Sequence, residues 1–238
     1  MAFGESAFII GASLTAINVA FVAITAVVAR MLGLGVEKIN ILAGPTLFKL
    51  RIGATTIAVK PIPIGSGVVF RGEGDGASGD EDAAAASFRS IYELHGWERM
   101  LLALSTPIGF LLIAFALTAG TMFAHAATAL QQIYLGAIQP SATGVDLLQQ
   151  YVDAWRINPL AALGILAAKY GVYLFVPTAG SPGFVAIACL LKLTLGYETP
   201  KDFNLLAAIP LFLPPLIVLG GWALATFWFL YPLLDSAI

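Results

Sequence analysis

The side chains that could perform chemistry in this chain are few and far apart. Its only histidines, His95 and His125, are 30 positions apart, and its single cysteine, Cys189, lies in an apolar run. Zinc sites need several nitrogen or sulfur ligands at short, fixed spacings, which this pattern does not supply. The acidic run at 73–82 lacks the ligand spacing of an EF-hand loop and is more typical of a solvated linker. The residues alone therefore predict no metal site and no cofactor.

Two lysines, Lys169 and Lys192, stand within apolar runs. A lysine inside a membrane can form a Schiff base or steer ions. More often such a lysine extends its amine to the membrane surface or pairs with an acid. Since neither lysine has an obvious carboxylate on its own predicted helix, a retinal-type or transport function is not favoured.

The elements that must position these residues are mostly apolar. Hydrophobic residues make up 59% of the 238 residues, charged residues make up 11%, and the mean hydropathy is +0.88. A chain of this composition belongs in a bilayer. A net charge of -2 without a lysine or arginine cluster argues against nucleic acid binding. We therefore expect an integral membrane protein whose partners are other integral membrane proteins and lipid, not nucleic acid.

Two uncharged runs are long enough to cross a bilayer, which takes about 20 helical residues. They cover residues 7–29 and 100–124, and Trp97 precedes the second run, where an interfacial aromatic residue is expected. The first run lacks the basic start of a cleaved signal peptide, so we expect it to be retained as a span.

The later apolar runs are less regular. Residues 157–197 are helical in pattern and either cross the membrane or lie at its surface. The last run is longer than one helix needs, and Pro210, Pro214 and Pro215 are expected to break it, which places the last span at 215–234. The chain is thus predicted to be one membrane domain, residues 1–238, with about 3 to 5 transmembrane helices.

Basic residues gather between the first two predicted spans. Eight of the 12 lysines and arginines lie within residues 30–99. Cytoplasmic segments of membrane proteins carry this excess of positive charge. We therefore predict that residues 30–99 are cytoplasmic and that the N-terminus is outside, in a bacterial cytoplasmic (inner) membrane. Residues 71–99 are expected to be a cytoplasmic linker, because their first half is rich in glycine, alanine and acids.

The region 41–70 has the pattern of a small antiparallel β-hairpin or sheet after the first helix. Residues Thr46–Lys60 alternate apolar and polar around Gly53, and Pro61 and Pro63 end the strand pairing because proline lacks a backbone donor. An open sheet edge cannot face lipid. We expect this sheet to rest on the membrane, or to enter it where other protein satisfies its backbone.

Short motifs follow one another in a distinctive order along the chain. They begin at the end of the first span and continue into the second: Val28-Ala29-Arg30-Met31-Leu32-Gly33, Gly44-Pro45-Thr46-Leu47-Phe48, Ile62-Pro63-Ile64-Gly65, Ser87-Phe88-Arg89-Ser90, Trp97-Glu98-Arg99-Met100 and LLALSTPIGFLL at 101–112. Two later stretches are Gly180-Ser181-Pro182-Gly183 and Pro232-Leu233-Leu234-Asp235. In this order the motifs resemble the site-2 protease family of intramembrane zinc metalloproteases, and they imply its fold of membrane helices with a hairpin after the first core helix.

The resemblance also implies where the zinc site should be. That family has His-Glu-x-x-His on this span, with two imidazoles that hold zinc and a glutamate that activates water. The corresponding places here are held by Phe21, Val22, Ala23, Ile24 and Thr25, and Asp235 stands at the place of the third ligand. The glycine and asparagine of the second-span motif are Thr106 and Phe110. We therefore expect a pseudoprotease, which keeps the fold but is not an enzyme.

Two functions fit this expectation. The first is a structural subunit or assembly factor of a larger membrane complex. The second is a pseudoprotease that binds and regulates a transmembrane client helix without cleaving it, with the hairpin pairing to an extended segment of the client. The residues predicted to bind the partner are Thr46, Phe48, Leu50, Ile52, Thr56 and Ala58. A third hypothesis, an active protease with an unrecognised ligand set, has almost no support in the sequence.

Overall fold

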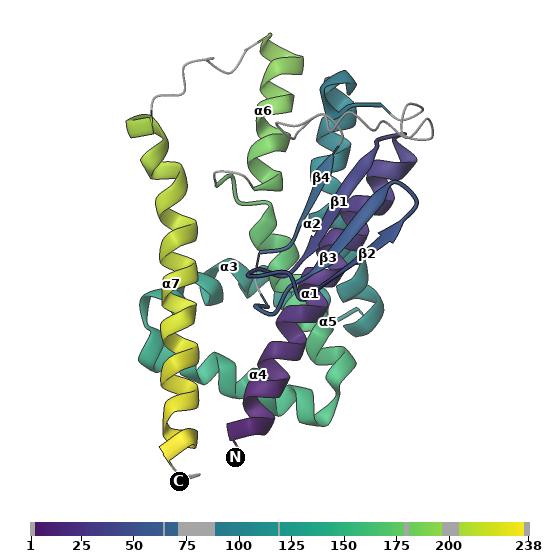
Figure 1. Ribbon diagram of the computed structural model, residues 1–238. Coiled ribbons are helices and arrows are strands. Elements are labelled where there is room, and N and C mark those ends of the chain that lie inside the picture. Colours follow the sequence, from purple (N-terminus) through teal and green to yellow (C-terminus); the bar gives the residue numbers. More distant parts are fainter. Residues whose placement is uncertain are drawn as a thin grey trace.

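The structure is a computed structural model that describes residues 3–63, 65–70, 89–118, 120–178, 181–196 and 205–235. Most of these residues are helical, and a small sheet follows the first helix (Figure 1). Most of the predicted linker, including its acidic run, lies outside the described residues.

Three helices are long and apolar enough to cross a membrane: α1 (Phe3–Met31), α2 (Gly96–Thr118) and the part Leu211–Leu234 of α7. They confirm the expected α-helical membrane fold and indicate an integral membrane protein. The second predicted span, 100–124, differs from the helix at both ends. After α2 ends, the chain turns at Gly120, whose φ of 93° favours glycine, and a new helix begins.

The prolines that we expected to interrupt the last apolar run lie inside one continuous helix, α7 (Leu205–Asp235). The expected break at Pro214 and Pro215 is therefore wrong. In a membrane, a helix satisfies its backbone groups internally, and local adjustments and neighbouring helices accommodate the groups that a proline frees. The predicted last span, 215–234, lies within this helix.

The stretch whose crossing was left open, 157–197, contains two short apolar helices, α5 (Pro159–Leu174) and α6 (Pro182–Leu195). They lie one after the other along α2, antiparallel to it (Figure 1). Close approaches run from one end of α2 to the other, at Gly164 with Thr118, Gly171 with Phe110 and Gly96 with Leu193. Two half-length helices thus accompany one full-length helix.

The joint between α5 and α6 has a local cause. Ser181 precedes α6, and its hydroxyl oxygen accepts a hydrogen bond from the backbone N–H of Phe184 at 3.1 Å, while Pro182 occupies the first helical position. A serine cap followed by proline is a strong helix start. The Ser-Pro-Gly stretch singled out in the sequence therefore begins a new helix here.

Two further helices, α3 (Met122–Ile138) and α4 (Val145–Ile157), are joined by a π-helical turn and connect α2 to α5. Polar contacts tie them to the long helices. Tyr151 donates a hydrogen bond to Ser13 at 2.7 Å, Arg156 pairs with Glu5, and the Trp222 indole N–H donates to the Ile133 carbonyl at 3.0 Å. These contacts hold α1 and α7 close to α4 and α3.

The sheet has the strand order β2-β3-β1-β4, with β1 (Val36–Ile41), β2 (Phe48–Ile52), β3 (Thr55–Val59) and β4 (Gly67–Phe70). The predicted hairpin is confirmed: β2 and β3 are antiparallel and meet at Gly53, whose φ is 59°. One pairing differs from the expected antiparallel sheet, because β1 and β3 are parallel. After β1, the chain forms the outer strand β2. It then turns back as β3, which lies between β2 and β1 and runs parallel to β1.

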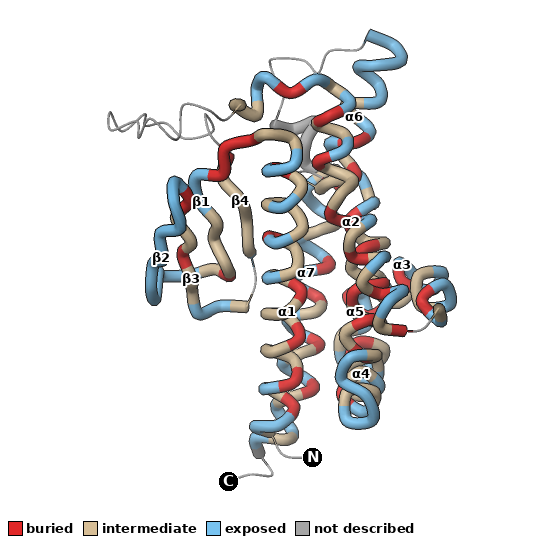
Figure 2. Tube along the Cα trace, turned by 90° about the vertical axis from the view of Figure 1, so that its right-hand side faces the viewer, coloured by how far each residue is buried: buried red, intermediate tan, exposed pale blue. Residues whose placement is uncertain are grey.

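The sheet lies beside the C-terminal half of α1 (Figure 2). Asn18, near the middle of α1, donates to the Pro63 carbonyl at 3.2 Å and accepts from the Ser66 N–H at 3.2 Å. Asn18 precedes the end of the helix by 13 residues, which is roughly 20 Å along its axis. Asn18 therefore satisfies backbone groups of the loop between β3 and β4, at the level of the middle of this candidate span.

Candidate functional site

A cavity of about 330 Å³ lies between α1, α2 and α6. Helix α1 contributes Phe21 and Thr25, α2 contributes Thr106 and Arg99, and α6 contributes Val185. Phe21 and Thr25 reach the same cavity because residues four apart share one face of a helix. The cavity therefore includes the two positions where the resemblance places the zinc-binding histidines.

The other positions of the degenerate motif point elsewhere. Val22 is buried with 3% exposure, and Ala23 is exposed. Ile24 packs closely against Gly109 of α2, since a Cβ added to this glycine would lie 2.8 Å from the Ile24 side chain. Of Asp235, the structure describes only the backbone, as the last residue of α7. The candidate metal positions are thus brought together only in part, at Phe21 and Thr25.

A hydrogen bond crosses the cavity wall between α1 and α2. The Thr25 and Thr106 hydroxyl oxygens are 3.1 Å apart, and the Thr25 hydroxyl also donates to the Phe21 carbonyl at 2.9 Å. A hydroxyl has only one proton, so Thr106 donates to Thr25. Both hydroxyls are engaged, and within the described residues no histidine, carboxylate or lysine side chain is hydrogen-bonded to either of them.

These residues do not fit a zinc ion. Phe21 has no donor atom, and the Thr25 hydroxyl already takes part in two hydrogen bonds. Zinc in proteins takes thiolate, imidazole and carboxylate ligands. Within the part of the chain that the structure describes, no three histidine, cysteine, aspartate or glutamate side chains come together. The part of the cavity lined by Phe21, Leu102, Ala103 and Val185 is suited to an apolar group.

The second-span motif position Phe110 belongs to the core. Its side chain is fully buried, and its ring makes an edge-to-face contact with Tyr170 of α5 at a centroid distance of 5.1 Å. Such aromatic pairs add stability beyond the area that they bury. Phe110 therefore joins α2 to α5, where the family motif has a polar asparagine.

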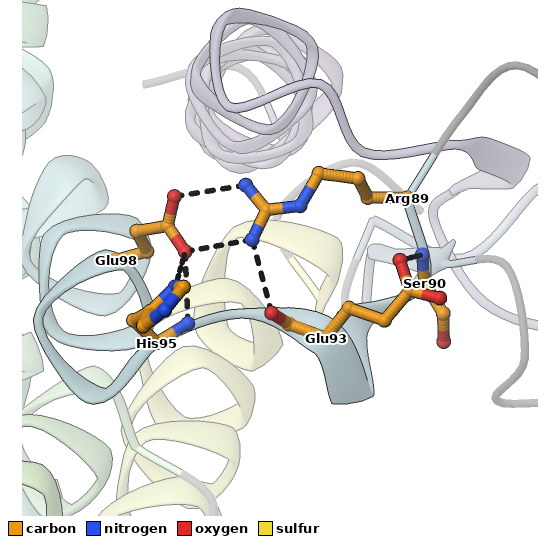
Figure 3. A network of polar contacts seen from close by, with 5 residues as sticks. All are labelled: Arg89, Ser90, Glu93, His95 and Glu98. Atoms are coloured by element: carbon orange, nitrogen blue, oxygen red, sulfur yellow. Dashed lines mark hydrogen bonds and ion pairs between the residues drawn. The ribbon is translucent and has the colours of Figure 1, made fainter.

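A polar network fixes the start of α2 (Figure 3). Arg89 donates two parallel hydrogen bonds to the Glu98 carboxylate, at 2.9 and 3.0 Å, and one to the Glu93 carbonyl at 3.0 Å. Glu98 also accepts from the His95 backbone N–H at 2.8 Å, as an acid in the first turn of a helix can. The hydrogen bonds to Glu98 raise the pKa of Arg89 further above its ordinary value.

Arg99 is the cavity residue that sequence reasoning missed as a binding residue. One guanidinium nitrogen donates to the Tyr92 carbonyl at 3.0 Å, while its Nε is buried and, among the described residues, has no hydrogen-bond partner. A buried donor without a partner is costly. The signal in the sequence was the run Trp97-Glu98-Arg99, a charged entry into an apolar span.

The predicted partner-binding residues fall into two groups. Phe48, Leu50 and Ile52 lie on β2, the outer strand, and expose 58%, 52% and 56% of their surface. Thr46 is exposed just before that strand. Thr56 and Ala58 lie on β3, which pairs with β1 on one side and β2 on the other. Only the first group is therefore at the edge of the sheet.

Comparison with known proteins gives one partial similarity. Over 92 residues, 37% of this chain, the sequence is 33% identical to a Chlamydia pneumoniae protein named "Putative zinc metalloprotease". The match spans 15% of that protein's length. No family model matches the chain. The chain is thus similar to part of a protein named as a zinc metalloprotease, the class of protein that its motifs resemble.

Proposed function

We propose that this chain is a non-catalytic, site-2-protease-like membrane protein that acts as a structural subunit or assembly factor of a larger membrane complex. The observation that carries the proposal is the hydrogen bond between Thr25 and Thr106. It joins α1 to α2 at a place where the family would hold a zinc-binding imidazole. Threonine hydroxyls that are already hydrogen-bonded, in place of zinc ligands, support a role in binding and scaffolding over hydrolysis.

The outer edge of the sheet supports a protein partner. Strand β2 is exposed along its whole length (Figure 2). Its sequence alternates apolar residues with Lys49 and Arg51. The sheet reaches toward Asn18 in the middle of α1, and an open edge at membrane depth is unfavourable in lipid. A neighbouring subunit that covers β2 would remove this cost.

A second candidate function uses the same edge. In this alternative, β2 pairs with an extended segment of a transmembrane client, and the protein holds or regulates that client without cutting it. The exposed side chains Phe48, Leu50 and Ile52 would then select the client, while Thr56 and Ala58 would support the edge from the neighbouring strand.

The test is affinity purification of the chain from native membranes in mild detergent, with sizing on a native gel and identification of bands by mass spectrometry. A single large complex of fixed stoichiometry is the expected result. Partners in variable, low amounts would favour the client-binding alternative. A stable species that carries the chain alone would overturn both functions.

A matched pair of variants then locates the contact. Leu50→Lys places a charge on the exposed edge strand and should release the partner. Ile157→Lys makes the same change at the end of α4, where the side chain is 87% exposed, and should leave the complex intact. Equal loss of the partner in both variants would contradict a contact through β2.

We also propose that residues 30–99 face the cytoplasm of a bacterial cell and that the N-terminus is outside, on the basis of the basic residues in that segment. A cysteine placed at Lys38, an exposed position on β1, in a chain with Cys189→Ser, should be blocked by a membrane-impermeant thiol reagent only after the cells are opened. Labelling in intact cells would reverse the orientation.

A further inference from the structure

We propose that the cavity between α1, α2 and α6 binds one anionic lipid, with an acyl chain between its apolar walls and the acidic head group at Arg99. The proposal does not depend on the function proposed above, because the site would exist in a subunit and in a client-binding protein alike.

The inner part of the cavity suits a hydrocarbon chain. Its walls include Phe21, Leu102, Ala103 and Val185, and its volume of about 330 Å³ is at the small end of the range for ligand pockets. The polar atoms that it does contain are satisfied, since the Thr25 hydroxyl accepts from its neighbour on α2 and donates to a backbone carbonyl. A hydrocarbon chain bound against the inner walls would therefore leave no hydroxyl without a hydrogen bond.

The other end of the cavity carries a positive charge. Arg99 precedes Thr106 by seven residues on α2, which places the two Cα atoms roughly 10 Å apart along the helix axis. The Arg99 Nε is buried and lacks a partner among the described residues. An anionic oxygen would supply this missing acceptor, and charge-assisted hydrogen bonds of this kind are stronger than neutral ones.

In the described part of the chain, the carboxylates near Arg99 are hydrogen-bonded to other groups. Glu98 is held by Arg89 through two hydrogen bonds, and the Glu93 carboxylate accepts from the Ser90 N–H at 3.2 Å. Among the described residues no carboxylate pairs with the Arg99 guanidinium, so its charge is available to an anionic ligand.

The position along the membrane fits a lipid head group. Arg99 lies in the first turns of α2, next to Trp97, which is 55% exposed. Tryptophan is enriched at the level of lipid head groups, and arginine near a helix end reaches the same level. An amphiphile with its charge at Arg99 and its chain toward Thr106 thus matches both the polarity of the cavity and its place in the helix.

The test uses the full chain in nanodiscs of equal phosphatidylglycerol and phosphatidylcholine, followed by native mass spectrometry of the lipid that stays bound. One retained phosphatidylglycerol is expected. Arg99→Gln should weaken the preference for the anionic lipid by about tenfold. Ala103→Leu, which fills the cavity, should reduce the binding of either lipid. Lys38→Gln, which removes an exposed cation on β1, is the matched control and should leave lipid retention unchanged.

Several results would overturn the proposal. An unchanged lipid preference in Arg99→Gln would remove the head-group contact, and unchanged retention in Ala103→Leu would remove the acyl-chain site. Displacement of the lipid by water-soluble glycerol phosphate would reduce the site to an anion site alone. If Arg99→Gln does not give a monodisperse protein, Arg99→Lys, which keeps the charge but loses the planar fork, should give a preference between wild type and none.

Discussion

Arg89 and Glu98 form a two-pronged ion pair that links the end of the first span to the start of the second. The Arg89 backbone N–H donates to the Gly33 carbonyl just after α1, at 2.9 Å, and its side chain holds the carboxylate in the first turn of α2 at 2.9 and 3.0 Å. The Glu98 side chain is only 10% exposed, so its charge depends on this partner.

Replacing the arginine should therefore destabilise the start of α2. We expect the melting temperature of the detergent-solubilised protein, followed by tryptophan fluorescence, to fall in the order wild type, Arg89→Lys, Arg89→Met, because lysine keeps the charge but not the fork. The double variant Arg89→Met with Glu98→Gln should recover part of the loss. If the double variant is no more stable than Arg89→Met, the unpaired Glu98 carboxylate is not the cause of the loss in stability.

Two histidines placed on α1 should share one metal ion. Phe21 and Thr25 both line the cavity, so Phe21→His with Thr25→His should bind more zinc than either single change after dialysis against the same low zinc concentration. Adding Val22→Glu should lower the melting temperature, because Val22 is buried. Zinc content by elemental mass spectrometry checks the metal. Equal zinc in the single and double variants would show that the two side chains do not converge.

The local parts of the fold were predictable because their signals are local. The hairpin follows from alternation around Gly53, whose positive φ the turn requires. The start of α6 follows from Ser181 and Pro182, and the ends of the apolar runs locate α1 and α2 to within a few residues. Each of these features is encoded in a stretch of fewer than about ten residues, or in a long uncharged run.

The long-range parts were not predictable from pattern. Parallel pairing of β1 with β3 depends on where β2 and the loop 42–47 lie, and the sequence VEKINI of β1 carries no mark of its neighbours. The predicted break at the prolines of α7 was wrong because the expectation applies to helices in water, where solvent can bond to the backbone groups that a proline leaves unpaired. Arg99 was missed because its importance depends on a cavity that α6, far along the chain, helps to form.

Close packing against α2 makes Gly164 of α5 sensitive to substitution, whereas Gly11 of α1 has open space beside it. A Cβ on Gly164 of α5 would lie 2.7 Å from Thr118 Cγ2 and 2.9 Å from Leu117 Cβ, whereas a Cβ on Gly11 of α1 would meet nothing within 4 Å. Gly164→Ala should cost about 1–3 kcal/mol of unfolding free energy through overpacking. Gly11→Ala should be neutral or stabilise by up to about 1 kcal/mol, since alanine favours the helix. Similar costs at both positions in detergent unfolding would argue against the tight α2–α5 contact.

His125 on α3 should make the stability depend on pH. Burial, and then the charge of Lys169, lower the pKa of this imidazole below its ordinary value of 6.5. The unfolded chain therefore binds a proton more readily than the folded protein. Stability is fully present above pH 6.5 and is lost as the pH falls below that value. We expect the melting temperature to decrease from pH 7.5 to 5.5, a window in which most carboxyl groups stay ionised.

The variant His125→Gln isolates this effect. Glutamine keeps a polar side chain at the position but cannot take up a proton, so the decrease in melting temperature between pH 7.5 and 5.5 should become smaller. The value at pH 7.5 should change little, because the imidazole is neutral there. The same slope in the variant and the wild type would assign the pH dependence to other groups. A steeper slope in the variant would reverse the sign of the argument, since it would mean that protonated His125 stabilises the folded protein.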